Sequence, residues 1–131
     1  LLVADRRGNN RIDSLRNILG DPHVALLFLV PGIGETLRVN GRAEISVDPE
    51  LLARFRIGSK APRSVLVVHI DKVFFQCSRA LIRSELWNAD RHLPRSALPS
   101  TGQMLQAVTH DRIDAQTYDR ELPPRLKATL Y

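Results

Sequence analysis

The chain has 131 residues, of which 44% are hydrophobic and 25% charged, and its formal net charge is +5. This length fits one domain with a real core and excludes two. The single cysteine, Cys77, excludes an internal disulfide and a cysteine-based zinc site, and it favours a reducing, cytoplasmic compartment. The longest apolar runs, residues 24–30 and 65–68, are far shorter than the ~20 residues that span a bilayer, so we expect no membrane partner.

Apolar residues 1–4 open the chain, and we predict them to be the end of a strand. Because the sequence starts in apolar residues without an initiating Met, we expect an upstream segment. A basic, polar turn over residues 5–11 leads into a short amphipathic helix, with Asn10 as its N-cap and Gly20 as its end. The apolar face of this helix recurs at helical spacing and consists of Ile12, Leu15, Ile18 and Leu19.

The start of this helix is a candidate anion site. The first N–H groups of a helix lack internal partners and carry the positive end of its dipole. Here Arg7 and Arg11 add guanidinium donors, and Asn9 and Asn10 add side-chain amides. Gly8 lets the backbone approach closely, and phosphate is the anion that best fits such donors. A solvated loop with ordinary capping remains the alternative.

The next two segments predict an antiparallel hairpin. Residues 23–30 are continuously apolar, which suits a strand buried on both faces. Residues 36–46 alternate between apolar and polar side chains, which is typical of a strand with one face buried. The linker over residues 31–35 is short and rich in turn residues, so the two strands should pair. Gly41 and Ala43 on the apolar face predict close approach by another backbone or a tight bend.

A helix should begin at Asp48, which we predict as its N-cap with Pro49 at its first position. A long extended stretch over residues 64–77 follows, and we expect a bulge or bend at residues 71–72. Strands joined by short turns, with few helices between them, indicate a mainly β chain folded as a small antiparallel barrel with peripheral helices.

Residues 78–87 are predicted to be a short helix that carries the only tryptophan. Beyond it, residues 89–131 form a polar tail, punctuated by prolines, that we predict to be irregular or helical. Within this tail residues 101–108 should be helical. We expect residues 1–131 to form a single domain with this tail at its end.

Familiar catalytic groupings are weak in this sequence, and the catalytic residues stay unassigned. The four histidines have no spacing that indicates shared ligation, so we predict no metal site. Cys77 lies near Arg79 and fits either a buried, inert cysteine or a thiol of lowered pKa; we favour the former.

The remaining polar groups suit a planar anionic ligand. Thr36 and Arg38 stand on the polar face of the predicted strand over residues 36–46, where they can bond ring oxygens and nitrogens. Arg83, Ser84 and Trp87 add a guanidinium, a hydroxyl and an aromatic face at helical spacing. The alternatives are that Arg38 is a surface residue and that Trp87 is a core residue.

Three stretches together resemble the pyridoxamine 5'-phosphate oxidase-like family, in a flavoprotein subgroup of unassigned substrate. Residues 8–22 hold the basic turn, the helix and an Asp-Pro turn, residues 35–43 end in Gly-Arg-Ala, and residues 73–87 contain a Cys-x-x-Ala-x-x-Arg-Ser-x-Leu-Trp pattern. The resemblance implies an antiparallel split β-barrel of the FMN-binding type, with FMN between the subunits of a homodimer. The first strands of the family, which carry further phosphate ligands, would precede Leu1.

By this resemblance, FMN is the expected cofactor and the site residues take three roles. The phosphate is held by Arg7, Asn9, Asn10 and Arg11. The ring edge meets Thr36 and Arg38. The site is closed by Arg83, Ser84 and Trp87, either from the same subunit or from its neighbour.

We therefore expect an FMN-dependent oxidoreductase that acts on an unassigned small-molecule substrate with an electron donor such as NAD(P)H. The alternative is a non-catalytic module on the same barrel that binds or senses a flavin or another cofactor. A nucleic-acid-binding barrel is disfavoured, because basic and acidic residues are interspersed and residues 36–46 hold no aromatic residue for base stacking.

Overall fold

A computed structural model of the chain describes residues 1–9 and 11–130. Asn10 and Tyr131 lie outside the described residues. The chain divides into two compact units, residues 1–89 and residues 90–130, which are described separately below. The single domain expected over residues 1–131 stays a prediction.

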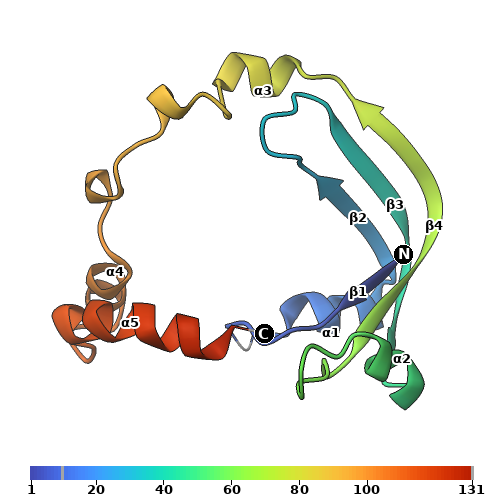
Figure 1. Cartoon of the computed structure of the whole chain (residues 1–131), viewed down its shortest axis with the longest axis horizontal. Helices are drawn as coiled ribbons and strands as arrows, with labels where there is room; N and C mark the ends of the chain where they lie inside the picture. Colours follow the sequence, from blue (N-terminus) through green and yellow to red (C-terminus); the bar gives the residue numbers. More distant parts are fainter. Residues whose placement is uncertain (10, 131) are drawn as a thin grey trace. The chain divides into compact units, whose positions relative to one another are not determined.

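The first unit is an antiparallel sheet of four strands in the order β1-β4-β3-β2, with short helices at its two ends (Figure 1). The helices α1 and α2 lie at one end of the sheet and α3 lies at the other. The elements in chain order are β1 (Leu2–Ala4), α1 (Asp13–Gly20), β2 (His23–Phe28), β3 (Thr36–Ser46), α2 (Pro49–Arg54), β4 (Val65–Gln76) and α3 (Arg79–Ser84).

The central pair of strands is β3 and β4, which are paired along the whole of β3, from Thr36 opposite Gln76 to Ser46 opposite Val65. The register shifts once, where Asn40 faces Lys72 and Gly41 faces Ile70, so Asp71 is the extra residue of a bulge in β4. The bulge expected at residues 71–72 is therefore confirmed.

The close approach predicted at Gly41 is also confirmed. A Cβ atom on Gly41 would lie 2.2 Å from the backbone oxygen of His69, so only glycine fits at this point of the pair. Because the glycine lies beside the bulge, the two strands can curve together without separating. The result is a curled antiparallel sheet that forms half of a barrel, which is consistent with the antiparallel split barrel that the sequence predicted.

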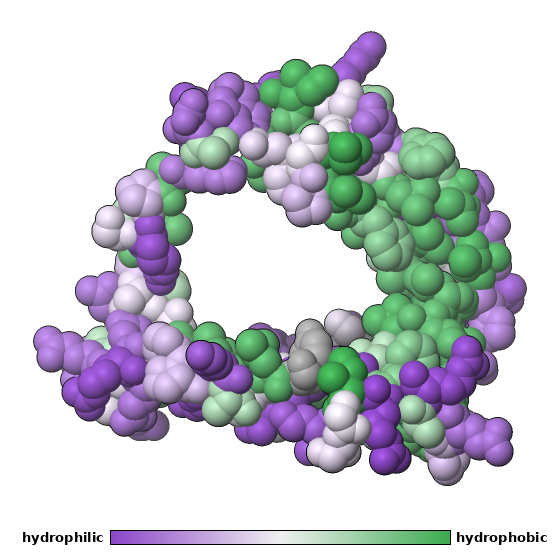
Figure 2. Space-filling model, in the orientation of Figure 1, coloured by the Kyte–Doolittle hydropathy of each residue, from purple (hydrophilic) through white to green (hydrophobic). Residues whose placement is uncertain are grey.

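The apolar face of the sheet is only partly covered. Val39, Ala43 and Val68 are buried on it, and the alternation predicted for residues 36–46 is confirmed. Toward the far end of β4, Phe75 is 80% exposed and Val73 is 52% exposed. Figure 2 shows hydrophobic side chains gathered along the sheet. A half-barrel therefore leaves apolar surface that a complete barrel or a partner would bury.

The strand predicted over residues 23–30 exists, but it is shorter than predicted and it is not buried on both faces. Strand β2 stops at Phe28 and contains no buried residue, with Leu27 50% exposed. Within the described sheet β2 is an edge strand that pairs only with β3. An apolar run alone does not distinguish a central strand from an edge strand. The predicted hairpin of β2 and β3 is confirmed.

Helix boundaries account for one further correction. The N-cap position of α1 is Ile12, which makes no side-chain capping bond, whereas Asn10, the residue predicted as the N-cap, lies outside the described residues. Helix α3 ends at Ser84, because Glu85 adopts a left-handed conformation, and Trp87 therefore lies beyond the helix. By contrast, Asp48 caps α2 as predicted, accepting a hydrogen bond of 2.9 Å from the backbone N–H of Leu51.

The second unit begins with irregular chain and ends in two helices. The predicted helix over residues 101–108 is confirmed as α4, whereas the last helix was not predicted because Pro123 and Pro124 lie inside it. The two helices pack closely at Gly102, whose N–H donates to Asp119 Oδ1 over 2.8 Å. The elements from residue 89 onward are η1 (Ala89–Arg91), η2 (Arg95–Ala97), α4 (Thr101–Val108) and α5 (Ala115–Thr129). None of the described helices has the length and apolar character that crossing a membrane requires.

The close contact at Gly41 gives a stability prediction. Replacing Gly41 with Ala forces a Cβ onto the His69 carbonyl, and we expect a loss of about 2–3 kcal/mol in the free energy of unfolding. Urea titration followed by circular dichroism measures it. The matched control is Gly20→Ala, where an added Cβ meets nothing within 4 Å. Equal stability of the two variants would contradict this view of the strand pair.

Candidate functional site

The basic turn predicted to hold phosphate follows β1 at one end of the sheet. The backbone N–H of Asp5 donates to the Ser64 oxygen over 2.9 Å, which extends the pairing of β1 with β4 by one residue. The guanidinium of Arg6 donates to the backbone oxygen of Phe55, at the end of α2. Arg6 thus anchors the turn to the fold, and Arg7 is the first exposed arginine after it.

Beyond this anchor the turn presents exposed donors. The Asn9 side-chain oxygen accepts from the backbone N–H of Arg11 over 3.0 Å, which shapes the turn. The Arg11 guanidinium pairs with Asp13, but both side chains are largely exposed, so the pair contributes little and can exchange for a stronger anion. The N-cap residue of α1, Ile12, makes no side-chain capping bond, and the first N–H groups of a helix can bind an anion. Asn10 lies outside the described residues.

The residues predicted to meet a flavin ring lie at the other end of β3. Thr36 is only 7% exposed, so its side chain is covered in this chain. Arg38 is half-buried, and its Nε donates to Gln76 Oε1 over 2.5 Å. Leu27 and Phe74 stand directly opposite Arg38 on the two neighbouring strands. The sequence did not single out Gln76, because the pairing of β3 with β4 is what brings it beside Arg38.

Of the three residues expected to close the site, Trp87 has a defined role in the fold. Its indole Nε1–H donates to the Ile33 backbone oxygen over 2.8 Å, which ties the segment after α3 to the β2–β3 loop. That loop is close-packed, since a Cβ on Gly34 would lie 2.8 Å from Ser78 Cβ. Ser84 donates to the Leu81 oxygen within its own helix, and Arg83 is exposed.

The structure therefore forms two groups of predicted residues and does not bring them together within one chain. The phosphate turn follows the pairing of Asp5 with Ser64, whereas Thr36 faces Gln76. Along β4, Ser64 and Gln76 are twelve residues apart, which corresponds to about 40 Å of strand. Arg7, Asn9 and Arg11 belong to the first group, and Thr36, Arg38 and Trp87 to the second.

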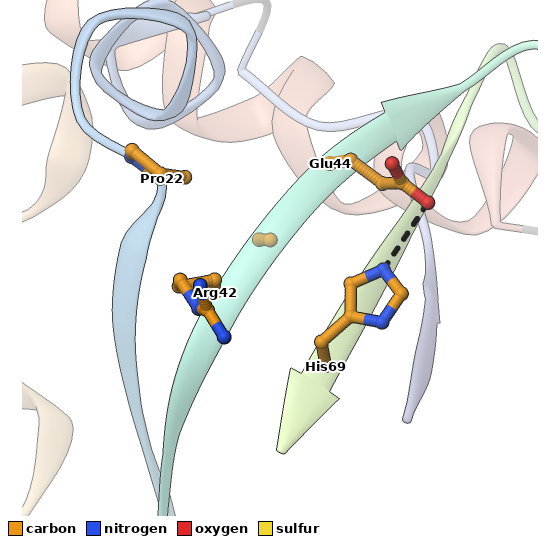
Figure 3. A pocket seen from close by; sticks show the side chains of 5 residues that line it. Pro22, Arg42, Glu44 and His69 are labelled. Carbon is orange, nitrogen blue, oxygen red and sulfur yellow. Dashed lines mark hydrogen bonds and ion pairs between the residues drawn. The ribbon is translucent and has the colours of Figure 1, made fainter. Parts of the chain in front are cut away.

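A shallow depression of about 380 Å³ lies on the polar face of the sheet between these two ends. Figure 3 shows Arg42 and Glu44 on β3 and His69 on β4, with the ring of His69 turned toward the Glu44 carboxylate 3.3 Å away. None of the predicted site residues lines it. Nearby, the exposed carboxylate of Asp21 accepts a hydrogen bond from the backbone N–H of His23 and makes a second one with the His23 ring. These bonds, the backbone one most of all, lower the pKa of Asp21.

No group of three His, Cys, Asp or Glu side chains that could hold a metal is found in the described part of the chain. Cys77 is exposed, so the expectation of a buried cysteine is wrong. It directly follows Gln76, the last residue of β4, and residues 69–76 of that strand are all exposed.

A comparison with protein families matches residues 1–77 to the family described as Pyridoxamine 5'-phosphate oxidase. This match covers more than half of the 131 residues. The chain belongs to this family. The resemblance seen in the sequence is thereby confirmed, and the curled four-stranded sheet agrees with the split-barrel fold. No curated protein and no solved structure matches the chain.

Members of the family commonly bind flavin, and the two groups of residues fit parts of such a ligand. The turn supplies two exposed arginines beside a helix start whose N-cap residue, Ile12, makes no side-chain capping bond, which suits a phosphate. The Arg38 end supplies a guanidinium among apolar side chains, which suits a planar polar ring. The match ends at Cys77, so Arg83, Ser84 and Trp87 lie beyond it.

The tie between Trp87 and Ile33 gives the second prediction. Replacing Trp87 with Phe keeps an aromatic ring but removes the indole donor, and we expect a loss of about 1 kcal/mol in the free energy of unfolding. Urea titration followed by circular dichroism measures the stability. Hydrogen exchange should also show faster exchange at the Ile33 amide, which bonds the Val30 oxygen within the same loop. Unchanged stability and exchange would show that Trp87 does not hold the loop.

Proposed function

We propose that the chain is a cytoplasmic, homodimeric FMN-binding protein and a flavin-dependent oxidoreductase. Its substrate is an unassigned small molecule, and its electron donor is a reduced carrier such as NAD(P)H. The observation that carries the proposal is the family match over residues 1–77, which includes both the phosphate turn and the strand bearing Thr36 and Arg38.

The residues of this chain would hold the cofactor at its two ends. Arg7 and Arg11 bind the phosphate with charge-assisted hydrogen bonds, supported by the amides of Asn9 and Asn10. Arg38 meets the ring edge, and Thr36, whose side chain is covered within this chain, stands two residues away on the same face of β3. Arg83, Ser84 and Trp87 close the ring end. The flavin supplies the two-electron chemistry, while the chain binds it, orients it and limits water around it.

The separation of the two groups supports a site shared between two copies. About 40 Å of strand lies between the phosphate turn and the Arg38 end, which exceeds the reach of one mononucleotide along the sheet. In a two-fold symmetric dimer the phosphate turn of one subunit can lie beside the Arg38 end of the other, and symmetry then makes two equal sites. The uncovered apolar surface at Phe75 and Val73 is further support for a partner.

The phosphate assignment gives the third prediction. Replacing Arg11 with Ala should weaken FMN binding by about 1.5–3 kcal/mol, because charge-assisted hydrogen bonds to the phosphate are lost. Quenching of flavin fluorescence on titration measures the affinity. Arg54→Ala, which removes one exposed arginine in the last turn of α2, is the control of equal charge. Equal FMN affinity of the Arg11 variant and the native chain would count against this assignment.

The shared site gives the fourth prediction. A variant with Arg7→Ala and Arg11→Ala lacks the phosphate end, and a variant with Arg38→Ala and Arg83→Ala lacks the ring end. After mixing and subunit exchange, about half of the dimers contain one subunit of each variant. Each of these mixed dimers has one intact site and one site without either end, so about a quarter of all sites should bind FMN tightly. Each variant alone should bind weakly. If mixing restores no tight binding, the site is not shared between subunits.

Turnover separates the oxidoreductase from a non-catalytic flavin-binding or sensing module. We expect NADH or NADPH to bleach the 450 nm flavin absorbance of the reconstituted protein, with recovery on adding an electron acceptor. Retained flavin that neither carrier reduces would favour the non-catalytic module. Protein that retains no flavin after reconstitution and desalting would contradict the proposal as a whole.

A further inference from the structure

We infer that Arg38, oriented by Gln76, makes the proposed flavin site bind reduced FMN in preference to oxidised FMN. This inference rests on the proposed function. It assigns a specific role to Arg38 and adds Gln76 as a positioning residue.

Arg38 occupies the middle of a cross-strand row on one face of the sheet. Leu27 of β2 lies opposite it on one side and Phe74 of β4 on the other. These neighbours are 50% and 40% exposed, respectively, so the row forms part of an accessible surface. The side chains directly opposite Arg38 on both neighbouring strands are thus hydrocarbon, and a ligand placed over the row would exclude water from the guanidinium and strengthen its electrostatic interaction with the cation.

Gln76 holds the guanidinium in one orientation. It is the diagonal neighbour of Arg38 across the β3–β4 pair, and its Oε1 accepts the hydrogen bond from Arg38 Nε. An amide oxygen fixes the planar group without neutralising its charge. This bond engages Nε alone, so the two terminal nitrogens keep their donors for a ligand.

No described residue compensates the charge of Arg38. Over residues 1–9 and 11–130 no carboxylate lies within ion-pair distance of Arg38. The contrast with two other arginines is direct, because Arg11 pairs with Asp13 and Arg42 pairs with Asp71. A half-buried cation that has an amide partner, apolar flanks and no counter-charge is suited to an anionic ligand.

Reduced flavin is such a ligand. The oxidised ring is neutral, and its reduction by two electrons with uptake of one proton leaves one negative charge on the ring. A hydride donor delivers these two electrons and the proton together and leaves in its oxidised form, so no other reactant is needed. A fixed cation at the ring edge therefore favours the reduced state and raises the midpoint potential of the bound flavin.

The experiment measures the midpoint potential of FMN bound to the full chain by spectroelectrochemistry, together with the affinity for oxidised FMN. Arg38→Gln should lower the ratio of reduced to oxidised affinity about tenfold, which equals a fall of about 30 mV for a two-electron couple. Gln76→Leu keeps the charge but frees the guanidinium, and it should produce a smaller fall. Arg38→Lys, which retains the charge without the Nε bond, should lie between the native chain and Arg38→Gln.

The matched control is Arg42→Gln, on the same strand and the same face, where Asp71 already compensates the charge. We expect its potential to equal that of the native chain. An unchanged potential in Arg38→Gln with FMN still bound would overturn this inference and leave the proposed function standing. An equal fall in Arg42→Gln would also overturn it, since the effect would then come from net charge alone. A native chain that binds no FMN would overturn both.

Discussion

The pairing of β3 with β4 is the constraint on which the rest of the first unit depends. Eleven residues of β3 stay in register with β4 across a single bulge at Asp71. The pair is close enough at Gly41 that no Cβ fits above the His69 carbonyl. Close contact between the strands and an extra residue in one of them together curve the sheet into half a barrel. The positions of β1, β2 and the helices follow from this pair.

The same pair of strands determines the layout of the candidate site. It places Gln76 beside Arg38 at one end and carries β1, with the phosphate turn that follows it, at the other. The residues proposed to hold a phosphate and those proposed to meet a planar ring therefore lie at opposite ends of the sheet. This separation is the reason for proposing a site shared between two copies of the sheet.

The two ends also differ in their electrostatics. At the phosphate turn Arg11 has an exposed carboxylate partner that an incoming anion must displace, which costs little because exposed pairs are weak. At the Arg38 end the guanidinium has an amide partner, hydrocarbon directly opposite it on both neighbouring strands, and no carboxylate partner among the described residues. The first end is suited to a permanent anion such as a phosphate. The second is suited to a ligand group that can take up a negative charge.

The sequence by itself determined the local features. Strict alternation specified β3 and its apolar face, Asp48 and Pro49 specified the start of α2, and an interruption at residue 71 specified the bulge. The basic turn and the family resemblance could also be recognised in the sequence, because each motif consists of residues that are adjacent along the chain. The edge position of β2, the partnership of Arg38 with Gln76 and the tie between Trp87 and Ile33 were decided only by the tertiary structure. Each of these depends on which segments lie side by side across long separations in sequence, and periodicity within one segment does not contain that information.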